Sequence, residues 1–359
     1  MWQRRDFLKM AGAGFAAGLM PQGALALERA DLVLVSACQK SDGDYAAALL
    51  DETGGLIATV DLPGRGHDVT QCRTTGRLVV FARRPGTFAI VLSPKGETLA
   101  TITSVPGRHF FGHGVFSPDG KLLYATENDY DAARGVIGVY DATDGFQRVG
   151  EFESNGIGPH DLTLSADGRV MCIANGGIET HPDFGRQKLN IPIMQPNLTF
   201  IDPVHGDVIA TQALDQDLHQ LSLRHLAPGA DGTVWVGGQY QGAPDRLVPL
   251  VARAGPDLAL DFAPIADPVL AKLSNYVGSV AANAEGDRVM VTSPVGGTAL
   301  VLDGNGAVLA EQSLASVCGA ASAQGGFYRS TGEGQLIDAA DRVVSEPVKF
   351  DNHLYAAAG

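Results

Sequence analysis

The chain alternates short apolar runs with polar turns, and one arrangement of these runs recurs along its length. The clearest copies are GHGVFSPDGKLLYATEND at residues 112–129 and PHDLTLSADGRVMCIANGG at residues 159–177. Each copy passes from a histidine through alternating apolar positions to an Asp-Gly turn, and a second apolar strand follows. Because Asp-Gly between alternating strands is a strong hairpin signal, the repeat predicts pairs of adjacent antiparallel strands.

The same order of histidine, strand, turn and second strand recurs in four further copies. Other apolar runs end in Asp followed by a Gly turn, which is typical of the third strand of a four-stranded blade. These copies lie at residues 66–84, 224–240, 278–294 and 317–333, and the third strands at 136–145, 198–207 and 298–306. A four-stranded propeller blade takes about 40–50 residues. The repeats therefore predict an all-β fold, a single seven-bladed β-propeller domain over residues 27–359.

The two ends of the repeated region each look like half of a blade. Residues 352–357 resemble an inner strand with nothing after it, and residues 31–37 resemble a second strand with no inner strand before it. Pairing of the C-terminal inner strand with the N-terminal strands would close the ring and leave only short sheet edges. Residues 178–197 are expected to form an inserted loop over one face.

Residues 1–26, ahead of the repeats, have the features of an export signal. Arg4 and Arg5 precede Phe7, Leu8 and Lys9, a mild apolar stretch follows, and residues 24–26 read Ala-Leu-Ala. The segment resembles a twin-arginine signal with a cleavage site. We therefore expect a periplasmic protein exported by the twin-arginine route, with no stable membrane span after cleavage.

The charge and the cysteine spacing of the chain argue against several classes of partner and cofactor. The chain has 40 acidic and 26 basic residues, a formal net charge of −14, and 45 glycines. An acidic chain is a poor partner for nucleic acid. The four cysteines, Cys38, Cys72, Cys172 and Cys318, are not arranged as Cys-x-x-Cys, which argues against a zinc ribbon and covalently attached haem.

Histidines recur at one place in the repeat, where the innermost strand of a blade begins. Cys318 and Ser279 occupy this place in the two other blades. Since inner strands border the central channel, we expect the five imidazoles to share one channel mouth and to bind a transition metal. A structural role is the alternative, because Gly-His pairs in WD-repeat propellers bond within their own blade. The five histidines are His67, His113, His160, His225 and His353, and Cys318 is a sixth candidate ligand.

The loop between the second and third strands of each blade should face the same mouth, because strands alternate in direction. Polar residues gather at these positions. Carboxylate and imidazole groups there are candidate ligands, and amides and guanidinium groups are candidate supporting or anion-binding groups. The candidate ligands are Glu127, Glu179 and His181, and the supporting candidates are Arg84, Asn175, Gln239 and Arg329.

Several of these motifs together resemble a bacterial family of unknown function, number 1513 among the domains of unknown function. The resemblance is carried by the twin-arginine signal and by residues 112–130, 156–162 and 174–183, and it covers nearly the whole mature chain. It implies an exported seven-bladed propeller encoded in iron-acquisition gene clusters beside imelysin-like and dihaem oxidoreductase-like proteins. It implies no settled activity.

Three functions follow as hypotheses. The first is a periplasmic propeller that binds iron or copper through the histidine ring and assists metal uptake, with or without a redox step. The second is a metal-free interaction scaffold of an uptake system. The third is a metal-dependent hydrolase or oxidase of a small molecule, which would need an open coordination position.

Overall fold

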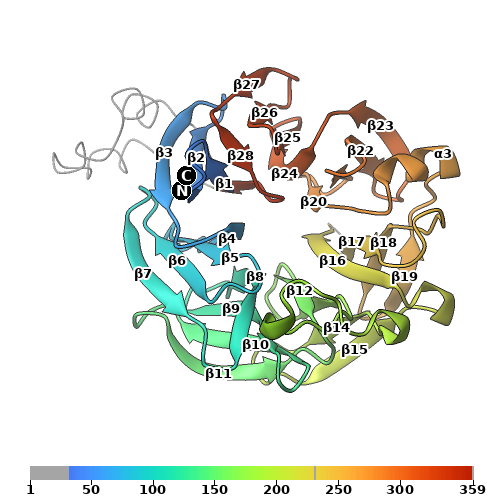
Figure 1. Ribbon diagram of the computed structural model, residues 1–359, viewed down its shortest axis with the longest axis horizontal. Helices are drawn as coiled ribbons and strands as arrows, with labels where there is room; N and C mark the ends of the chain where they lie inside the picture. The colour runs from blue at the N-terminus through green and yellow to red at the C-terminus, as the bar shows by residue number, and fades with distance from the viewer. Residues whose placement is uncertain (1–31, 230–231, 358–359) are drawn as a thin grey trace.

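The computed structural model describes residues 32–229 and 232–357, and its antiparallel strands form seven sheets around a central axis (Figure 1). Each sheet is one blade, numbered here from 1 to 7 along the chain. The predicted seven-bladed β-propeller is confirmed. The predicted export signal at residues 1–26 lies outside the described residues.

Blade 1 joins both ends of the described chain. It contains β1 (Val33–Lys40), β2 (Tyr45–Asp51), β3 (Leu56–Asp61), β28 (Val348–Phe350) and β29 (Tyr355–Ala357). β28 pairs with the end of β1 and β29 with its beginning, both antiparallel. The predicted closure is therefore confirmed, and the inner strand of blade 1 is interrupted between Phe350 and Tyr355, where His353 lies.

The other six blades each have four strands in sequential order from the channel outward. Blade 2 contains β4 (Gly66–Gln71), β5 (Leu78–Ala82), β6 (Phe88–Leu92) and β7 (Thr98–Thr103). Blade 3 contains β8 (Arg108–Phe116), β9 (Leu122–Asp129), β10 (Arg134–Asp141) and β11 (Gln147–Glu153). Blade 4 contains β12 (Pro159–Leu164), β13 (Met171–Asn175), β14 (Asn197–Ile201) and β15 (Val208–Ala213).

The second half of the ring repeats this plan. Blade 5 contains β16 (Leu221–Pro228), β17 (Val234–Tyr240), β18 (Val251–Gly255) and β19 (Leu258–Phe262). Blade 6 contains β20 (Ser279–Ala282), β21 (Arg288–Ser293), β22 (Thr298–Asp303) and β23 (Val308–Ser313). Blade 7 contains β24 (Val317–Ala323), β25 (Gly326–Thr331), β26 (Gln335–Ile337) and β27 (Val343–Ser345).

Short helical turns lie in the connections. They are η1 (Pro182–Phe184), η2 (Ile191–Ile193), η3 (Gln216–Leu218), α3 (Asp267–Leu270) and η4 (Ala271–Leu273). η1 and η2 belong to the inserted loop predicted at residues 178–197. Within the described chain, no helix has the length and apolar character needed to span a membrane.

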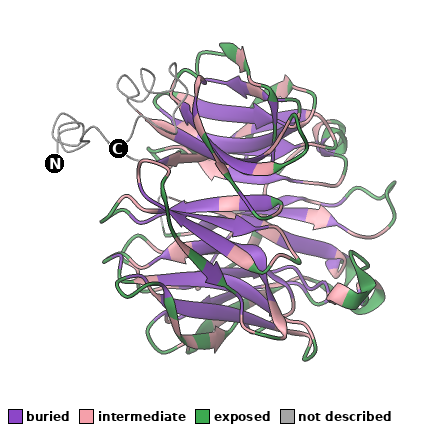
Figure 2. Ribbon diagram, turned by 60° about the vertical axis from the view of Figure 1, so that its left-hand side comes forward, coloured by how far each residue is buried: buried purple, intermediate pink, exposed green. Residues whose placement is uncertain are grey.

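The hydrophobic core lies between neighbouring blades. The middle strands of a blade are buried on both faces, whereas outermost strands such as β11 and β15 alternate exposed and partly buried positions (Figure 2). Phe81 of blade 2 packs with Phe110 and Tyr140 of blade 3, and Tyr328 of blade 7 belongs to the cluster that also holds Leu34 of blade 1. This burial drives the blades together and fixes where the inner strands begin.

Candidate metal centre

The five predicted histidines come together in the central channel. Neighbouring ring centroids are 4.9 Å apart for His67–His113, 5.1 Å for His113–His160 and 4.8 Å for His160–His225. The circuit closes through His353, whose ring lies 4.8 Å from that of His225 and 4.7 Å from that of His67. The imidazoles of five blades therefore form one ring, and blades 6 and 7 contribute none.

Backbone irregularities coincide with the histidines. In each inner strand of blades 2 to 5, the pairing register with the second strand shifts at or directly beside the histidine. Such bulges are known to re-aim a side chain out of the regular pleat. The shifts lie between Gly66 and Val69, between Phe110 and Gly114, between Pro159 and Asp161, and between Leu223 and His225.

One glycine makes room for this packing. Gly112, beside His113, has a φ of +116°, a conformation that side chains rarely adopt. A Cβ atom at this position would lie 2.4 Å from Cδ2 of His67. The Gly-His sequence at this repeat therefore lets the inner strand of blade 3 approach the histidine of blade 2.

His353 is held by contacts across the ring closure. Its carbonyl oxygen accepts a hydrogen bond of 2.6 Å from the Ser36 hydroxyl, and the Asp351 amide donates to the Ala37 carbonyl at 2.8 Å. Both partners lie in β1. The closure of the propeller thus also places the fifth imidazole.

Three aspartates orient the ring, and the sequence analysis did not assign them this role. Nδ1 of His113 lies 3.1 Å from a carboxylate oxygen of Asp68 and 3.2 Å from one of Asp161. Nδ1 of His67 lies 3.3 Å from Asp351. Each contact crosses from one blade to the next. The signal available in the sequence was the His-Asp dipeptide at residues 67–68 and 160–161, repeated at equivalent positions.

Burial and these carboxylates set the charges of the ring. Burial holds the pKa of His67, His160 and His225 well below the usual range, and it lowers that of His353 to about 4. Burial also opposes the charged form of His113, but Asp161 and Asp68 together outweigh it and raise the pKa of His113. Four neutral imidazoles therefore surround one that carries the positive charge in the metal-free protein.

Several ring nitrogens are buried without any hydrogen-bond partner. Leaving a buried polar atom unpaired costs about 1–3 kcal/mol. Two groups of three histidines bring one nitrogen each within 4.8 Å of one another, namely His67, His113 and His353, and His113, His160 and His225. The unpaired atoms are Nε2 of His113, His160 and His353 and both nitrogens of His225. This donor set fits a metal ion, because a cation that displaces the proton from Nε2 of His113 would satisfy several lone pairs at once.

The aspartates beside the ring are also arranged as they would be around a metal site. A histidine that ligates a metal almost always gives its other ring N–H to a carboxylate, which fixes the tautomer and the ring orientation. His113 has this arrangement, with Nδ1 facing Asp68 and Asp161 and Nε2 unpaired. Because Nε2 is its one remaining donor and both groups include His113, the ring is suited to one ion at a time.

Four other candidate residues lie in second strands and not in the loops where the sequence analysis expected them. Their strands keep hydrogen-bonded register through these positions; Glu127 pairs with Val136, for example, and Asn175 with Asn197. The four are Glu127 in β9, Asn175 in β13, Gln239 in β17 and Arg329 in β25. None belongs to either histidine group.

These residues have other partners. Glu127 is fully buried, accepts a 2.6 Å hydrogen bond from the Tyr140 hydroxyl and lies 3.0 Å from the Arg148 guanidinium. Asn175 donates to the Ser154 carbonyl at 2.7 Å, and Arg329 pairs with Asp341 at 2.8 Å. Their roles at a metal remain predictions.

Glu179 and His181 lie in the inserted loop as expected. The backbone N–H of Glu179 donates to Asn190, and Nε2 of His181 lies 3.1 Å from Asp131. The Cys318 thiol is buried near the Ser330 and Phe350 carbonyls, and burial raises its pKa to about 12. All four cysteines are buried and free of disulfides. Neither histidine group includes Glu179, His181 or Cys318.

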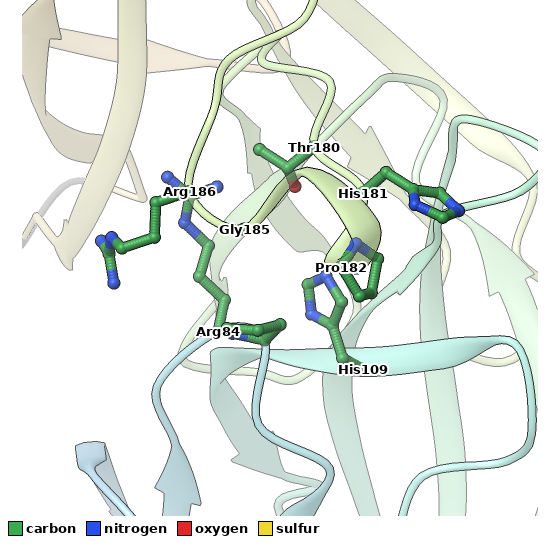
Figure 3. Close-up of a pocket in the computed structure, with 8 residues that line it drawn as sticks. Arg84, His109, Thr180, His181, Pro182, Gly185 and Arg186 are labelled. Carbon is green, nitrogen blue, oxygen red and sulfur yellow. The ribbon is translucent and has the colours of Figure 1, made fainter.

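Arg84 lies where expected, in the loop after β5. It lines a surface pocket together with Arg186 of the inserted loop, which the sequence analysis did not single out (Figure 3). Arg224 was also missed, although it directly precedes His225. These arginines do not occupy equivalent positions in the repeat, so comparing the repeats does not single them out.

Solved structures of other proteins resemble this chain over most of its length. Hydrazine synthase of Kuenenia stuttgartiensis is 15% identical with a TM-score of 0.60, over 87% of this chain and 94% of that one. The Cps50 (Swd1) β-propeller domain of Myceliophteria thermophila is 12% identical with a TM-score of 0.58, over 92% and 95%. Identities this low support the fold alone.

No curated protein matches this chain. A family model does match, over residues 60–357, which hold all five channel histidines and six complete blades. Its description is "Protein of unknown function (DUF1513)". The chain therefore belongs to the DUF1513 family of proteins of unknown function.

Proposed function

We propose that the chain is a periplasmic protein that binds one iron or copper ion through its channel histidines and assists metal uptake. The observation that carries the proposal is the convergence of buried imidazole nitrogens that have no hydrogen-bond partner among the described residues. Neutral imidazole is a good ligand for Fe, Cu, Zn and Ni. The histidine content favours copper, and the gene context implied by the family resemblance favours iron.

The three aspartates beside the ring are a second observation that supports metal binding. Asp68 and Asp161 together face His113, and Asp351 faces His67. Carboxylates behind the ring increase the basicity of a ligating imidazole and offset the positive charge of a bound ion. A purely structural histidine ring would gain nothing from its unpaired Nε2 atoms.

Metal analysis by mass spectrometry tests the proposal. Native protein, exported through its own signal, is compared with a His113→Ala/His160→Ala variant that disrupts both histidine groups. His205→Ala is the matched control, because His205 lies in an exposed turn beside Asp202. We expect about one Fe or Cu per chain in the native and control proteins, and none in the double variant.

Folding of the double variant is checked by circular dichroism, so that metal loss is not confused with unfolding. Native protein that is isolated without metal and binds neither Fe(II) nor Cu(II) on titration near pH 7 would falsify the proposal. Export is tested separately by changing Arg4 and Arg5 to lysine, which should retain the protein in the cytoplasmic fraction.

An interaction scaffold is the second candidate function. Apolar side chains on the inserted loop support it, since Phe184 is 53% and Ile193 is 74% exposed. Exposed apolar patches often mark protein interaction sites. Under this proposal the partner is an imelysin-like or dihaem oxidoreductase-like protein. Phe184→Ser/Ile193→Ser should abolish its co-purification without changing metal content, whereas the histidine variants should leave co-purification intact.

A further inference from the structure

Basic side chains from three parts of the chain lie near one another. Arg83 and Arg84 follow β5, Arg186 and Lys188 belong to the inserted loop, and Arg224 precedes His225 in β16. They are close enough to influence one another. The pKa of Arg84 falls to about 9, mainly through burial and then through repulsion from Arg224, Arg186 and Arg83.

Part of this cluster has no anionic partner. Arg83 and Arg65 both pair with Asp351, at 2.7 Å and 2.5 Å. Within the described residues, by contrast, no carboxylate forms an ion pair with Arg84 or Arg186. The chain has 40 acidic residues against 26 basic ones, so this imbalance at one place does not follow from composition.

Arg84 and Arg186 lie on the same side of a partly open pocket beside the inserted loop, and the Arg186 side chain extends outward from it (Figure 3). Thr180 also lines this pocket; its side chain is only 6% exposed, and its hydroxyl has no hydrogen-bond partner. His109, opposite, has both ring nitrogens occupied, by the Phe110 carbonyl at 2.8 Å and the Asn128 amide at 3.1 Å. Two guanidinium groups without a carboxylate partner among the described residues therefore lie at this pocket, and the Thr180 hydroxyl is buried beside it.

The guanidinium and hydroxyl groups of this pocket can all donate hydrogen bonds to an oxyanion. Guanidinium groups bind carboxylate and phosphate oxygens through paired N–H donors, and a hydroxyl adds a third donor. We propose that this pocket binds a small oxyanion, a phosphate or the carboxylate group of a small molecule, through Arg84, Arg186 and Thr180. The anion relieves the repulsion between the two guanidinium groups and supplies the partner that the Thr180 hydroxyl lacks.

The remaining basic residues extend this site toward the channel. Arg83 shares Asp351 with His67, at 2.7 Å and 3.3 Å, and Arg224 directly precedes His225 in β16. A ligand with more than one anionic group would contact this inner pair as well. The oxyanion site is built from residues outside the histidine ring, and it does not depend on the metal proposed above.

Titration calorimetry on chelator-treated, metal-free protein tests the site, with inorganic phosphate and citrate as separate probes. Low ionic strength is used, because the Debye length is about 10 Å at 0.1 M salt. The main variant is Arg84→Gln/Arg186→Gln. Its control is Lys121→Gln/Arg169→Gln, which removes the same charge from exposed hairpin turns where Asp119 and Asp167 are the partners.

We expect at least one probe to bind native and control protein alike, and the main variant to bind it about tenfold more weakly or worse. Thr180→Val, a substitution of similar shape, should weaken binding less but measurably. Tighter binding of phosphate would identify a phosphate site, and tighter binding of citrate a polycarboxylate site. Equal binding by the main and control variants, or no binding of either probe to native protein, would overturn the proposal. Metal content of the main variant separates this result from failure of the metal site.

Discussion

His225 shows most clearly how a single residue at the channel can be tested. Both of its ring nitrogens are buried without a partner, so the protein itself gains no hydrogen bond from the imidazole. The cost of such unpaired atoms is about 1–3 kcal/mol each. Under the proposed function, His225 is a metal ligand whose unpaired nitrogens lower the stability of metal-free protein, unlike His113 with its two carboxylates.

Replacing His225 with leucine should leave the free energy of unfolding of metal-free protein unchanged or raise it by about 1 kcal/mol. The same substitution should weaken metal binding, because it removes one member of a histidine group. Urea unfolding and metal titration measure the two effects. A loss of stability without any change in metal affinity would instead support a structural histidine.

The aspartates behind His113 allow a second test at this scale. Asp68→Asn/Asp161→Asn keeps hydrogen-bonding groups but removes both negative charges beside Nδ1. Loss of such supporting carboxylates typically weakens metal affinity by about 10–100-fold. Competition with a chelator of known affinity measures the change. Asp131→Asn, beside exposed His181, is the control and should leave the affinity as it is.

Among the elements, blade 3 contains a buried ion network that has a structural role. Glu127 accepts from Tyr140 and lies within 3.4 Å of the Arg108 and Arg148 guanidinium groups. Glu151, on the outermost strand, pairs with the same two arginines. The network ties β8, β9, β10 and β11 together across the whole blade.

Glu127→Ala should lower the free energy of unfolding by about 3–5 kcal/mol, because it leaves buried positive charge and the Tyr140 hydroxyl without their partner. Glu153→Ala, which removes an exposed ion pair with Arg134 in the same blade, should cost less than about 1 kcal/mol. Denaturant unfolding of both variants checks this. Equal stability of the two variants would mean that Glu127 is not an anchor of the blade.

Glu151 makes the stability of blade 3 depend on pH. Its hydrogen bond to Arg108 lowers the pKa of Glu151 from 4.5 to about 2. Since the folded pKa lies below the unfolded value, charged Glu151 stabilises the fold above about pH 4.5, and this contribution is lost as the pH falls toward 2. The difference in unfolding midpoint between native protein and Glu151→Gln should therefore narrow between pH 7 and pH 3. A gap that stays constant would contradict the assignment.

For the whole molecule, the histidine ring is a junction of five blades. His353 belongs to the closure segment of blade 1, and the other four histidines come from blades 2 to 5. A ligand held by this ring binds the folded propeller and not the unfolded chain. Binding therefore stabilises the folded state by an amount that rises with the logarithm of the ligand concentration once that concentration exceeds Kd.

Addition of the preferred metal should raise the free energy of unfolding by about 2.7 kcal/mol at a free concentration of 100 times Kd, and a chelator should reverse the increase. Thermal unfolding measured with and without metal tests this expectation. His113→Ala/His160→Ala should show no such increase, whereas His205→Ala should respond as native protein does. An equal increase in the double variant would place the metal elsewhere.

The fold, and the place of the five histidines within it, could be predicted from the sequence alone. Alternating strands, Asp-Gly turns and the divided terminal repeat are local patterns, and each acts through hydrogen bonds and burial within one blade or the next. The equivalence of His67, His113, His160, His225 and His353 follows from counting within the repeat. For the same reason, the closure by residues 352–357 was predictable.

The surroundings of these histidines, by contrast, depend on contacts between distant parts of the chain. The contact of His113 with Asp68 joins residues 45 positions apart, and that of His67 with Asp351 joins residues 284 apart. The register shifts at the histidines, and the approach of Arg186 in the inserted loop to Arg84, also depend on the tertiary structure. Such contacts depend on how neighbouring blades pack, and a pattern within one repeat holds no information about that packing.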